Sequence, residues 1–321
     1  SRGKAQRPIK RPMVDSGLLA KAGDFLGDRQ GASNSWIVHG SRTVDGGPLL
    51  ASDPHAALDA PATFWAVHLN MPASGSLDGR ALNLHGIQLP GVPSVFSGIN
   101  ERLAWATTTA SYDYTDVYLE TVTPGADGGP GTVLHKGAQV PIERVVETIE
   151  VGFAGQIHQT EELVYDVVPH HGPIVPAGDD AGLVDGTSER LSVRWVAGRP
   201  EHSVLGFLEL AFAHDVTEAE EALDHFGAGG ANWTVATMEG DIFYSGSSFI
   251  PVRPDACMRF HPGTNPEGLA PFFVQPGDGT CDWEGGLDDK HIPHAINPEK
   301  GYVVTANEDQ TGATFDNDPL N

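Results

Sequence analysis

Short runs in which apolar and polar residues alternate recur through the first third of the chain. Alternation with a period of two predicts half-buried β-strands, because successive side chains of a strand point to opposite faces. The runs with a β-rich pattern are residues 35–40, 49–51, 64–69, 82–89, 94–99, 103–108 and 116–122. Turns rich in glycine and proline separate them, and many short strands that restart in this way favour packed antiparallel sheets.

The middle of the chain continues in extended segments. Residues 123–200 have the pattern of hairpins, with a turn at Pro124-Gly-Ala-Asp-Gly-Gly-Pro-Gly131. Two long extended runs, residues 139–151 and 156–168, lie on either side of Gly152-Phe-Ala-Gly155 and predict one hairpin. We expect this hairpin-rich excursion to form a peripheral arm rather than part of the core.

Helices are predicted after this excursion, at residues 205–213 and 217–226. At the second helix, Thr217 and Glu220 have the spacing of a capping box, and Gly227 follows the predicted end. Strands return at residues 233–237, 241–245 and 302–306. The order of elements therefore predicts a core of two sheet layers with a minority of helix, which is an α+β fold.

Composition limits the kinds of partner. The chain has 321 residues, of which 40% are hydrophobic, so it can fill a core and should be globular. Acidic residues outnumber basic ones by 43 to 19, and the net charge is −24. Nucleic acid and anionic membranes are poor candidates for partners, because phosphate binding needs a positive surface. No run of about 18 apolar residues exists, so the sequence predicts no transmembrane helix.

The chain has two cysteines, Cys257 and Cys281. Their number and spacing do not suggest a zinc site. One disulfide, as in an exported protein, and two buried free thiols both remain open.

One serine stands before a predicted strand and behind two small residues, in Gly31-Ala32-Ser33. A serine hydroxyl is a weak nucleophile without a base, and one solution uses the residue's own α-amino group, freed when the preceding peptide bond is cut. Small neighbours leave room for Ser33 to attack the carbonyl of Ala32. An α-amine titrates near about pH 8, so it can accept the hydroxyl proton. Turn chemistry alone favours the plainer interpretation of a capping or turn serine.

A series of short motifs occurs in a fixed order between Ser33 and Asp309. They are Ser33-Asn-Ser-Trp36, Leu49-Leu-Ala-Ser-Asp-Pro-His55, Leu89-Pro-Gly-Val-Pro93, Ser97-Gly-Ile-Asn-Glu-Arg102 with Ala104-Trp105, Asp116-Val-Tyr-Leu-Glu120, His171-Gly-Pro173, Leu191-Ser-Val-Arg-Trp195, Asn232-Trp233 and Gly301-Tyr-Val-Val-Thr-Ala-Asn307. In this order the chain resembles the penicillin acylase family, serine N-terminal nucleophile hydrolases that cleave N-acyl amides.

The resemblance implies an αββα sandwich, in which helices flank two antiparallel sheets and Ser33 lies at the end of a central strand. It also implies a precursor that cuts itself into an α chain and a β chain. Residues 1–32 would then be the end of the α region with its linker, and residues 33–321 the N-terminal part of a longer β chain. The implied partner is the α chain, and the implied location is the periplasm or the medium, since family members are usually exported.

Catalytic roles follow from the same resemblance. Ser33 matches the nucleophile, and its own amine matches the base. His55, on the loop after predicted strand 49–51, would orient and tune this amine, although an ordinary loop histidine is the alternative. Thr109 would offer its backbone N–H, and Asn232 its side-chain amide, to the negative oxygen of the intermediate. Arg253 resembles the arginine that holds this asparagine in place.

A metal site is also implied. Asp113 and Asp116, with the carbonyl of Thr115 between them, match the calcium-binding stretch of the family. Oxygen ligands at closely spaced positions suit a hard cation such as Ca²⁺. A polar turn before a strand explains the same residues without a metal. No organic cofactor is implied.

The implied function is hydrolysis of an N-acyl amide bond in a small molecule such as a penicillin, a cephalosporin, an acyl-homoserine lactone or a lipopeptide. Two other classes stay open. A Ser-His-Asp hydrolase would pair Ser33 or another serine with His55 or His171, although no Gly-x-Ser-x-Gly turn lies between a strand and a helix. A non-catalytic, acidic, cation-binding extracellular β module would explain the acidity and the aspartates without any chemistry.

Overall fold

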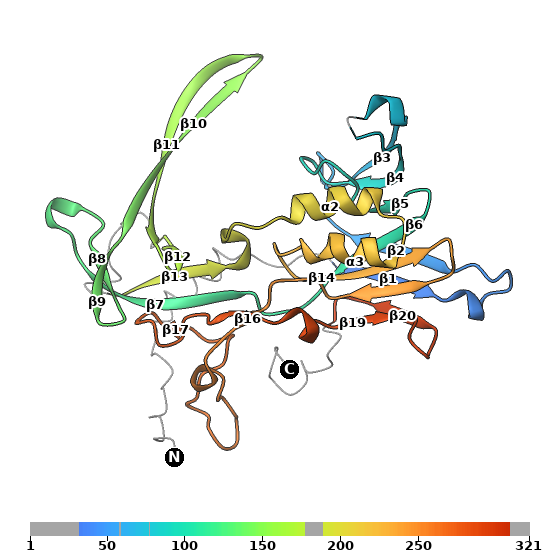
Figure 1. Ribbon diagram of the computed structural model, residues 1–321. Helices are drawn as coiled ribbons and strands as arrows, with labels where there is room; N and C mark the ends of the chain where they lie inside the picture. Colours follow the sequence, from blue (N-terminus) through green and yellow to red (C-terminus); the bar gives the residue numbers. More distant parts are fainter. Residues whose placement is uncertain (1–31, 58, 77, 177–188, 309–321) are drawn as a thin grey trace. The chain divides into compact units, whose positions relative to one another are not determined.

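The computed structural model describes residues 32–57, 59–76, 78–176 and 189–308 (Figure 1). Contacts divide these residues into two compact units. We call residues 32–114, 199–250 and 286–308 the Ser33 unit, and residues 115–176, 189–198 and 251–285 the hairpin unit. The hairpin unit therefore contains most of the excursion that the sequence predicts, together with a segment from later in the chain.

Two antiparallel sheets form the framework of the Ser33 unit. The smaller sheet has the order β2-β1-β20, and the larger has the order β19-β15-β14-β6-β5-β4-β3. The strands are β1 (Ala32–Val38), β2 (Leu49–His55), β3 (Trp65–Met71), β4 (Leu82–Gln88), β5 (Ser97–Ile99), β6 (Leu103–Thr109), β14 (Ala231–Thr237), β15 (Ile242–Ser245), β19 (His294–Ile296) and β20 (Tyr302–Thr305). Strands β1 and β2 contact β6 and β14, so the two sheets lie face to face.

Two helices, α2 (Ser203–Phe212) and α3 (Val216–Asp224), lie side by side over the other face of the larger sheet (Figure 1). The side chain of Asp215 caps α3 by accepting from the Glu218 N–H at 2.9 Å. The predicted capping box at Thr217 and Glu220 is therefore wrong. Asp215 lies two residues earlier and offers a charged acceptor to the positive end of the helix.

Apolar side chains fill both spaces between these layers. The core between the helices and the larger sheet includes Trp105, Phe207, Leu210, Trp233 and Phe243. The core between the two sheets includes Ile37, Ala236, Ile242, Tyr244 and Val303. Alternate residues of β14 enter the two cores, which explains why this strand is buried along its whole length.

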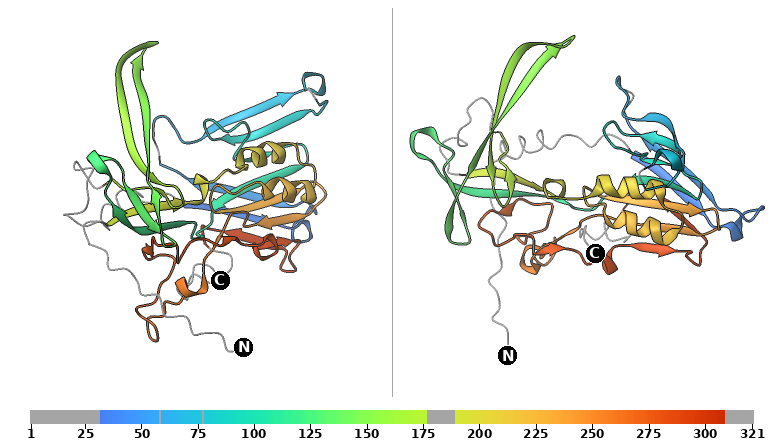
Figure 2. Two further views of the ribbon diagram at one scale, coloured as in Figure 1. Left: turned by 60° about the vertical axis from the view of Figure 1, so that its left-hand side comes forward. Right: turned by 45° about the horizontal axis from the view of Figure 1, so that its top comes forward.

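The hairpin unit has two antiparallel arrangements, β13-β7-β8-β9 and β10-β11-β12, and β17 pairs in parallel with β7. Its strands are β7 (Thr115–Thr123), β8 (Thr132–His135), β9 (Ala138–Pro141), β10 (Glu143–Phe153), β11 (Gln156–Val168), β12 (Gly172–Pro173), β13 (Glu189–Trp195), β16 (Pro251–Val252) and β17 (Gln275–Pro276). The short strand β18 (Gly285–Gly286) lies where the sequence passes from the hairpin unit to the Ser33 unit. Strands β10 and β11 form a long hairpin that extends away from β7 and β13 (Figure 2).

A turn of two residues, Ala154 and Gly155, connects β10 to β11. Both residues have positive φ, 51° and 79°, which suits the right-handed twist of a tight hairpin. The predicted hairpin is thus confirmed. The predicted single run over residues 139–151 is wrong, because β9 ends at Pro141 and β10 begins at Glu143. Proline lacks the N–H that an uninterrupted ladder requires.

Cys257 and Cys281 form a disulfide in the hairpin unit, with their Cα atoms 5.9 Å apart. This result decides between the two alternatives that the sequence left open. The described part of the chain contains no helix long and apolar enough to cross a membrane.

Candidate active site

Ser33 is the second residue of β1 and lies half-buried at the start of this strand. Ser35 and Ile37 follow on the same face and are buried, so Ser33 faces the larger sheet. The Ser33 hydroxyl donates a hydrogen bond to the carbonyl oxygen of Ala32 at 2.7 Å. The nucleophile that the sequence predicts therefore lies against the carbonyl of the bond it is expected to cut.

Asn307 holds the backbone nitrogen of Ser33. The Ser33 N–H donates to Oδ1 of Asn307, and Nδ2 of Asn307 donates to the carbonyl of Thr109 at 3.1 Å. Asn307 follows β20 with a φ of 73°, a left-handed conformation that asparagine tolerates better than most residues. Its own carbonyl accepts from the hydroxyl of Ser111 at 2.6 Å. Sequence analysis missed this residue, although it closes the last of the motifs.

Thr109 is the last residue of β6 and pairs with Ala231 of β14. The next pair is joined by a hydrogen bond from the Ala110 N–H to the Gly230 carbonyl. Bonded and non-bonded pairs alternate in an antiparallel ladder, so the N–H of Thr109 points away from β14. The predicted role of this N–H as an oxyanion donor stays a prediction.

Asn232 is fully buried on β14, opposite Thr108. Its Oδ1 accepts a hydrogen bond from the hydroxyl of Tyr244 at 2.7 Å. This bond fixes the orientation of the amide, with the oxygen toward Tyr244 and the nitrogen away from it. Its Nδ2 donates to the Glu308 carbonyl at 3.1 Å and lies 3.5 Å from the Thr109 carbonyl. The structure thus brings Ser33, Thr109 and Asn232 together around Asn307.

His55 lies in a strand rather than in the predicted loop, because β2 extends to this residue. It pairs with Ala32, so its side chain shares the Ala32 face of the sheet rather than the Ser33 face. Its Nε2 lies 2.9 Å from Oδ2 of Asp53, and the side chain is 45% exposed. The predicted effect of His55 on the amine stays a prediction.

Arg253 belongs to the hairpin unit, where it binds the buried carboxylate of Asp116. Its Nε lies 2.8 Å from Oδ2 and its Nη2 lies 3.0 Å from Oδ1, a bidentate geometry. The indole N–H of Trp283 donates to the same carboxylate. The predicted role of Arg253 toward Asn232 stays a prediction, and the amide oxygen of Asn232 is held by Tyr244.

The predicted calcium ligands can be tested against this arrangement. A calcium ion needs six to eight oxygen ligands. Both oxygens of Asp116 already accept hydrogen bonds from a guanidinium, whose positive charge also repels a second cation. A calcium ion would therefore have to share the Asp116 oxygens with the guanidinium, and Asp116 stays a prediction as a ligand. Asp113 and Thr115 stay predictions as ligands.

His171 cannot serve as the base of the Ser-His-Asp alternative. Nδ1 of His171 lies 2.6 Å from Oε1 of Glu120, and Nε2 lies 2.9 Å from Oδ1 of Asp282. Both ring nitrogens therefore face carboxylates, and neither is left to accept a serine proton.

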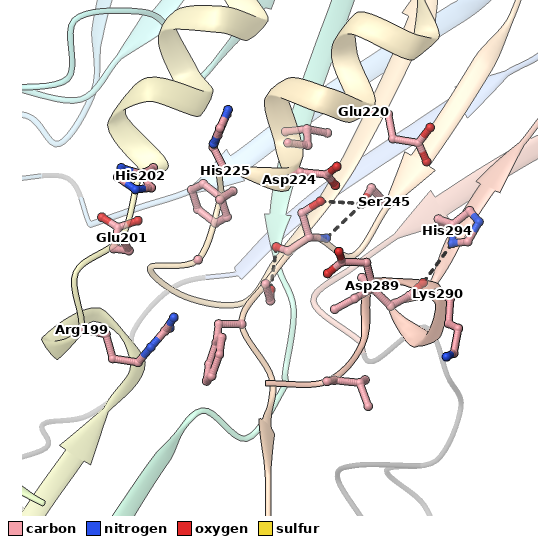
Figure 3. Close-up of a pocket in the computed structure, with 18 of the residues that line it drawn as sticks. Arg199, Glu201, His202, Glu220, Asp224, His225, Ser245, Asp289, Lys290 and His294 are labelled. Atoms are coloured by element: carbon pink, nitrogen blue, oxygen red, sulfur yellow. Dashed lines mark hydrogen bonds between the residues drawn. The ribbon is translucent and has the colours of Figure 1, made fainter. Parts of the chain in front are cut away.

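A cavity of about 440 Å³ lies elsewhere in the Ser33 unit, beside the end of α3 (Figure 3). Glu201, Glu220, Asp224 and Asp289 line it together with His202, His225, His294, Arg199 and Lys290. None of the predicted catalytic residues lines this cavity. It is therefore separate from the group around Ser33.

The Ser33 unit has two antiparallel sheets face to face, with Ser33 at the start of the inner strand of the smaller sheet. The profile of the penicillin amidase family matches residues 4–320. The chain belongs to this family.

Individual relatives agree with this assignment. The chain is 28% identical over 305 residues to penicillin acylase 2 proenzyme of Pseudomonas sp. (strain SE83), covering 92% of this chain and 34% of the relative. It is 28% identical over 278 residues to acyl-homoserine lactone acylase QuiP of Pseudomonas fluorescens (strain Pf0-1), covering 86% of this chain and 30% of the relative. The chain thus spans about a third of the length of these curated relatives.

A solved structure of similar fold is consistent with the α+β class. The thermostable penicillin G acylase from Alcaligenes faecalis matches with a TM-score of 0.65 and 24% identity, over 85% of this chain and 43% of that chain.

Proposed function

We propose that the protein containing this chain hydrolyses the amide bond of small N-acyl substrates through an acyl-enzyme on Ser33. The observation that carries this proposal is the contact of the Ser33 hydroxyl with the Ala32 carbonyl, at 2.7 Å, beside a backbone nitrogen that Asn307 holds. This distance joins Oγ to the carbonyl oxygen, so Oγ lies beside the carbonyl group whose carbon it has to attack.

The first reaction would be the cut at Ala32-Ser33. Ser33 Oγ attacks the Ala32 carbonyl carbon, the C–N bond breaks, and the Ala32 acyl group passes to Oγ as an ester. The nitrogen takes up the hydroxyl proton and becomes the α-amine. Water then hydrolyses the ester, which leaves a carboxylate on Ala32 and a free hydroxyl and amine on Ser33.

Turnover would repeat the same chemistry on a substrate. The amine accepts the proton of Oγ, directly or through water, while Oγ attacks the amide carbonyl. The proton then passes to the leaving amine as the C–N bond breaks, and water releases the acid from the ester. Oδ1 of Asn307, which holds the nitrogen before the cut, would hold the amine in position afterwards.

Two donors would stabilise the negative oxygen of each intermediate. The N–H of Thr109 points away from β14, and Nδ2 of Asn232 is aimed by the bond of Tyr244 to the other end of the amide. A substrate oxygen would take the position on Nδ2 that the Glu308 carbonyl now occupies. Losing one donor of this kind typically costs about 10²–10³ in kcat.

The partner and the outer layer follow from the same proposal. Trp36, Tyr302 and Val304 lie 40%, 41% and 49% exposed on the smaller sheet. Large apolar side chains gathered on a sheet face usually mark a surface that another element covers. We propose that an α chain of the same precursor supplies this cover and completes the αββα sandwich, as the word proenzyme in the name of one relative suggests.

Export is proposed on separate grounds. The disulfide between Cys257 and Cys281 is a bond that persists in the periplasm or outside the cell and is rare in the cytosol.

The test uses the full-length gene product and a panel of N-acyl p-nitroanilides. The panel carries phenylacetyl and straight-chain acyl groups, chosen because the relatives are penicillin and acyl-homoserine lactone acylases. We expect release of p-nitroaniline from at least one substrate, and an acyl group on the peptide that begins with Ser33. Ser33→Ala should abolish both, while Ser41→Ala, an exposed serine nearby, should change neither. Full activity in Ser33→Ala would refute the proposal.

A further inference from the structure

Three histidines of the hairpin unit bring ring nitrogens within 4.8 Å of one another. His135 ends β8, and His170 and His171 lie in the turn between β11 and β12. The rings of His135 and His170 stack with centroids 3.7 Å apart, and those of His170 and His171 meet edge to face at 4.4 Å. Three imidazoles from two separate segments therefore converge on one point.

The carboxylate of Asp282 contacts two of these three histidines. Oδ2 of Asp282 is 2.9 Å from Nε2 of His135, and Oδ1 is 2.9 Å from Nε2 of His171. Lys136 adds a contact from Nζ to Oδ2 at 2.7 Å. Asp282 directly follows the disulfide-bonded Cys281, so its backbone is anchored. Three imidazole nitrogens and one carboxylate oxygen are the donor set of a tetrahedral zinc site.

A second carboxylate lies behind His171. Oε1 of Glu120 is 2.6 Å from Nδ1 of His171, and both side chains are fully buried. The hydroxyl of Ser192 donates to the same oxygen at 2.6 Å. A carboxylate on the far nitrogen fixes the tautomer and the orientation of a metal-binding histidine. Nε2 of His171 is thereby directed toward Asp282 and the other two rings.

His170 supplies the observation that a metal-free network does not explain. Its Nε2 is buried and has no hydrogen-bond partner within the described residues. In the neutral form of the ring this nitrogen can offer its lone pair to a metal.

We propose that His135, His170, His171 and Asp282 bind one Zn²⁺ ion. A zinc ion about 2.0–2.1 Å from each nitrogen holds tetrahedral ligands about 3.4 Å apart, so the ligand nitrogens need to approach one another and the stacked rings of His135 and His170 need to turn their edges toward the ion. With four protein ligands the site is closed and therefore structural rather than catalytic. It joins the β8–β9 turn, the β11–β12 turn and the segment after the disulfide. This inference does not depend on the proposed function.

Access is compatible with loading from solvent. The side chains of His135 and Asp282 are 14% and 16% exposed, whereas His171 is fully covered. An ion would therefore arrive on the side of His135, His170 and Asp282 and would meet His171 last.

The experiment titrates Zn²⁺ into chelator-stripped full-length protein by calorimetry and records the visible spectrum with Co²⁺ as a substitute. We expect one ion per chain, a tetrahedral Co²⁺ spectrum and a higher melting temperature with Zn²⁺. Glu120→Gln should weaken binding about 10- to 100-fold, as changes behind a metal ligand generally do. His170→Ala should weaken it by at least as much. His158→Ala, an exposed histidine of β11, is the matched control and should bind like the parent.

Folding of each variant is checked by near-ultraviolet circular dichroism. His170 is only half-buried, so His170→Ala should fold even if changes at buried His171 do not. Absence of stoichiometric binding, or equal affinity in His170→Ala and the parent, would overturn the proposal. The histidines would then form a metal-free network around His171 and its two carboxylates.

Discussion

Buried polar residues differ in kind between the two units. In the described part of the Ser33 unit they are all uncharged: hydroxyls, and the one amide of Asn232. In the hairpin unit they include Asp116, Glu120, His171 and Arg253, each 5% exposed or less. One unit therefore buries single donors and acceptors, while the other buries opposite charges in pairs.

The difference has a physical meaning. An uncharged amide or hydroxyl costs little to bury if it is hydrogen-bonded, and its N–H stays available for a negative charge that appears only during a reaction. A buried ion pair holds its partners through strong mutual attraction, but each ion is costly once the other is removed. The Ser33 unit is thus suited to transient charge, and the hairpin unit to fixed charge.

The largest effect is expected from breaking a charged pair. Asp116→Asn leaves the guanidinium of Arg253 buried without a counter-charge, and we expect unfolding free energy to fall by about 3–5 kcal/mol. Urea unfolding measures this loss. Replacing both partners with apolar residues, as in Asp116→Leu with Arg253→Met, should cost clearly less than Asp116→Asn. A loss below about 1 kcal/mol in Asp116→Asn would contradict the assignment of a buried pair.

Removing an uncharged donor should instead affect rate. Asn232→Ala deletes the side-chain amide beside the Thr109 carbonyl, and we expect kcat to fall about 10²–10³-fold, with unfolding free energy changing less than in Asp116→Asn. Steady-state kinetics on the best p-nitroanilide gives the number. Asn70→Ala, on the exposed face of β3, is the control. A kcat within threefold of the parent would remove Asn232 from the oxyanion site.

A smaller effect is expected at Tyr244, which binds the amide of Asn232. Tyr244→Phe keeps the ring in the core and removes only the hydroxyl that binds Oδ1 of Asn232 at 2.7 Å. The amide of Asn232 then loses a hydrogen bond that stabilises its orientation by about 1 kcal/mol, so kcat should fall about fivefold while KM stays nearly constant. A change in KM alone would indicate that Tyr244 contacts substrate instead of positioning Asn232.

The smallest effect is expected at the cavity of Figure 3. Burial, and after it the charges of Asp289 and Glu220, raise the pKa of Asp224. An acid with a raised pKa in the folded state destabilises the fold once ionised, so the penalty appears as pH rises and is absent in acid. Asp224→Asn should therefore stabilise by a few tenths of a kcal/mol at pH 8 and not at pH 3. Thermal unfolding at both pH values checks this; a larger gain in acid would contradict the shift.

Local pattern was sufficient to predict most strands and both helices. Alternation identifies β1, β6 and β7, and the helical period identifies α2 and α3 to within a few residues. Local pattern fails where the chemistry of one residue outweighs the periodicity of the sequence. Pro141 ends a strand, and Asp215 provides a better helix cap than Thr217. Strand β2 continues through Pro54 to His55. Strand β13 was missed because its residues were considered only as a motif.

The site was predicted in part for a different reason. Ser33, Thr109 and Asn232 have a recognisable local context, and the structure brings them together. Asn307 and Tyr244 act through contacts with residues distant in sequence, which no local pattern shows. The same limit applies to Asp116, whose pairing with Arg253 spans most of the unit and was not foreseen.

The central claim is that Ser33 becomes a chain terminus and then acts as nucleophile. Intact mass and N-terminal sequencing of the full-length gene product, beside its Ser33→Ala variant, test it most directly. We predict a chain that begins Ser33-Asn34-Ser35-Trp36 in the parent and an uncut precursor in the variant. A parent that stays uncut while remaining folded, or a variant that is cut at the same bond, would contradict the account.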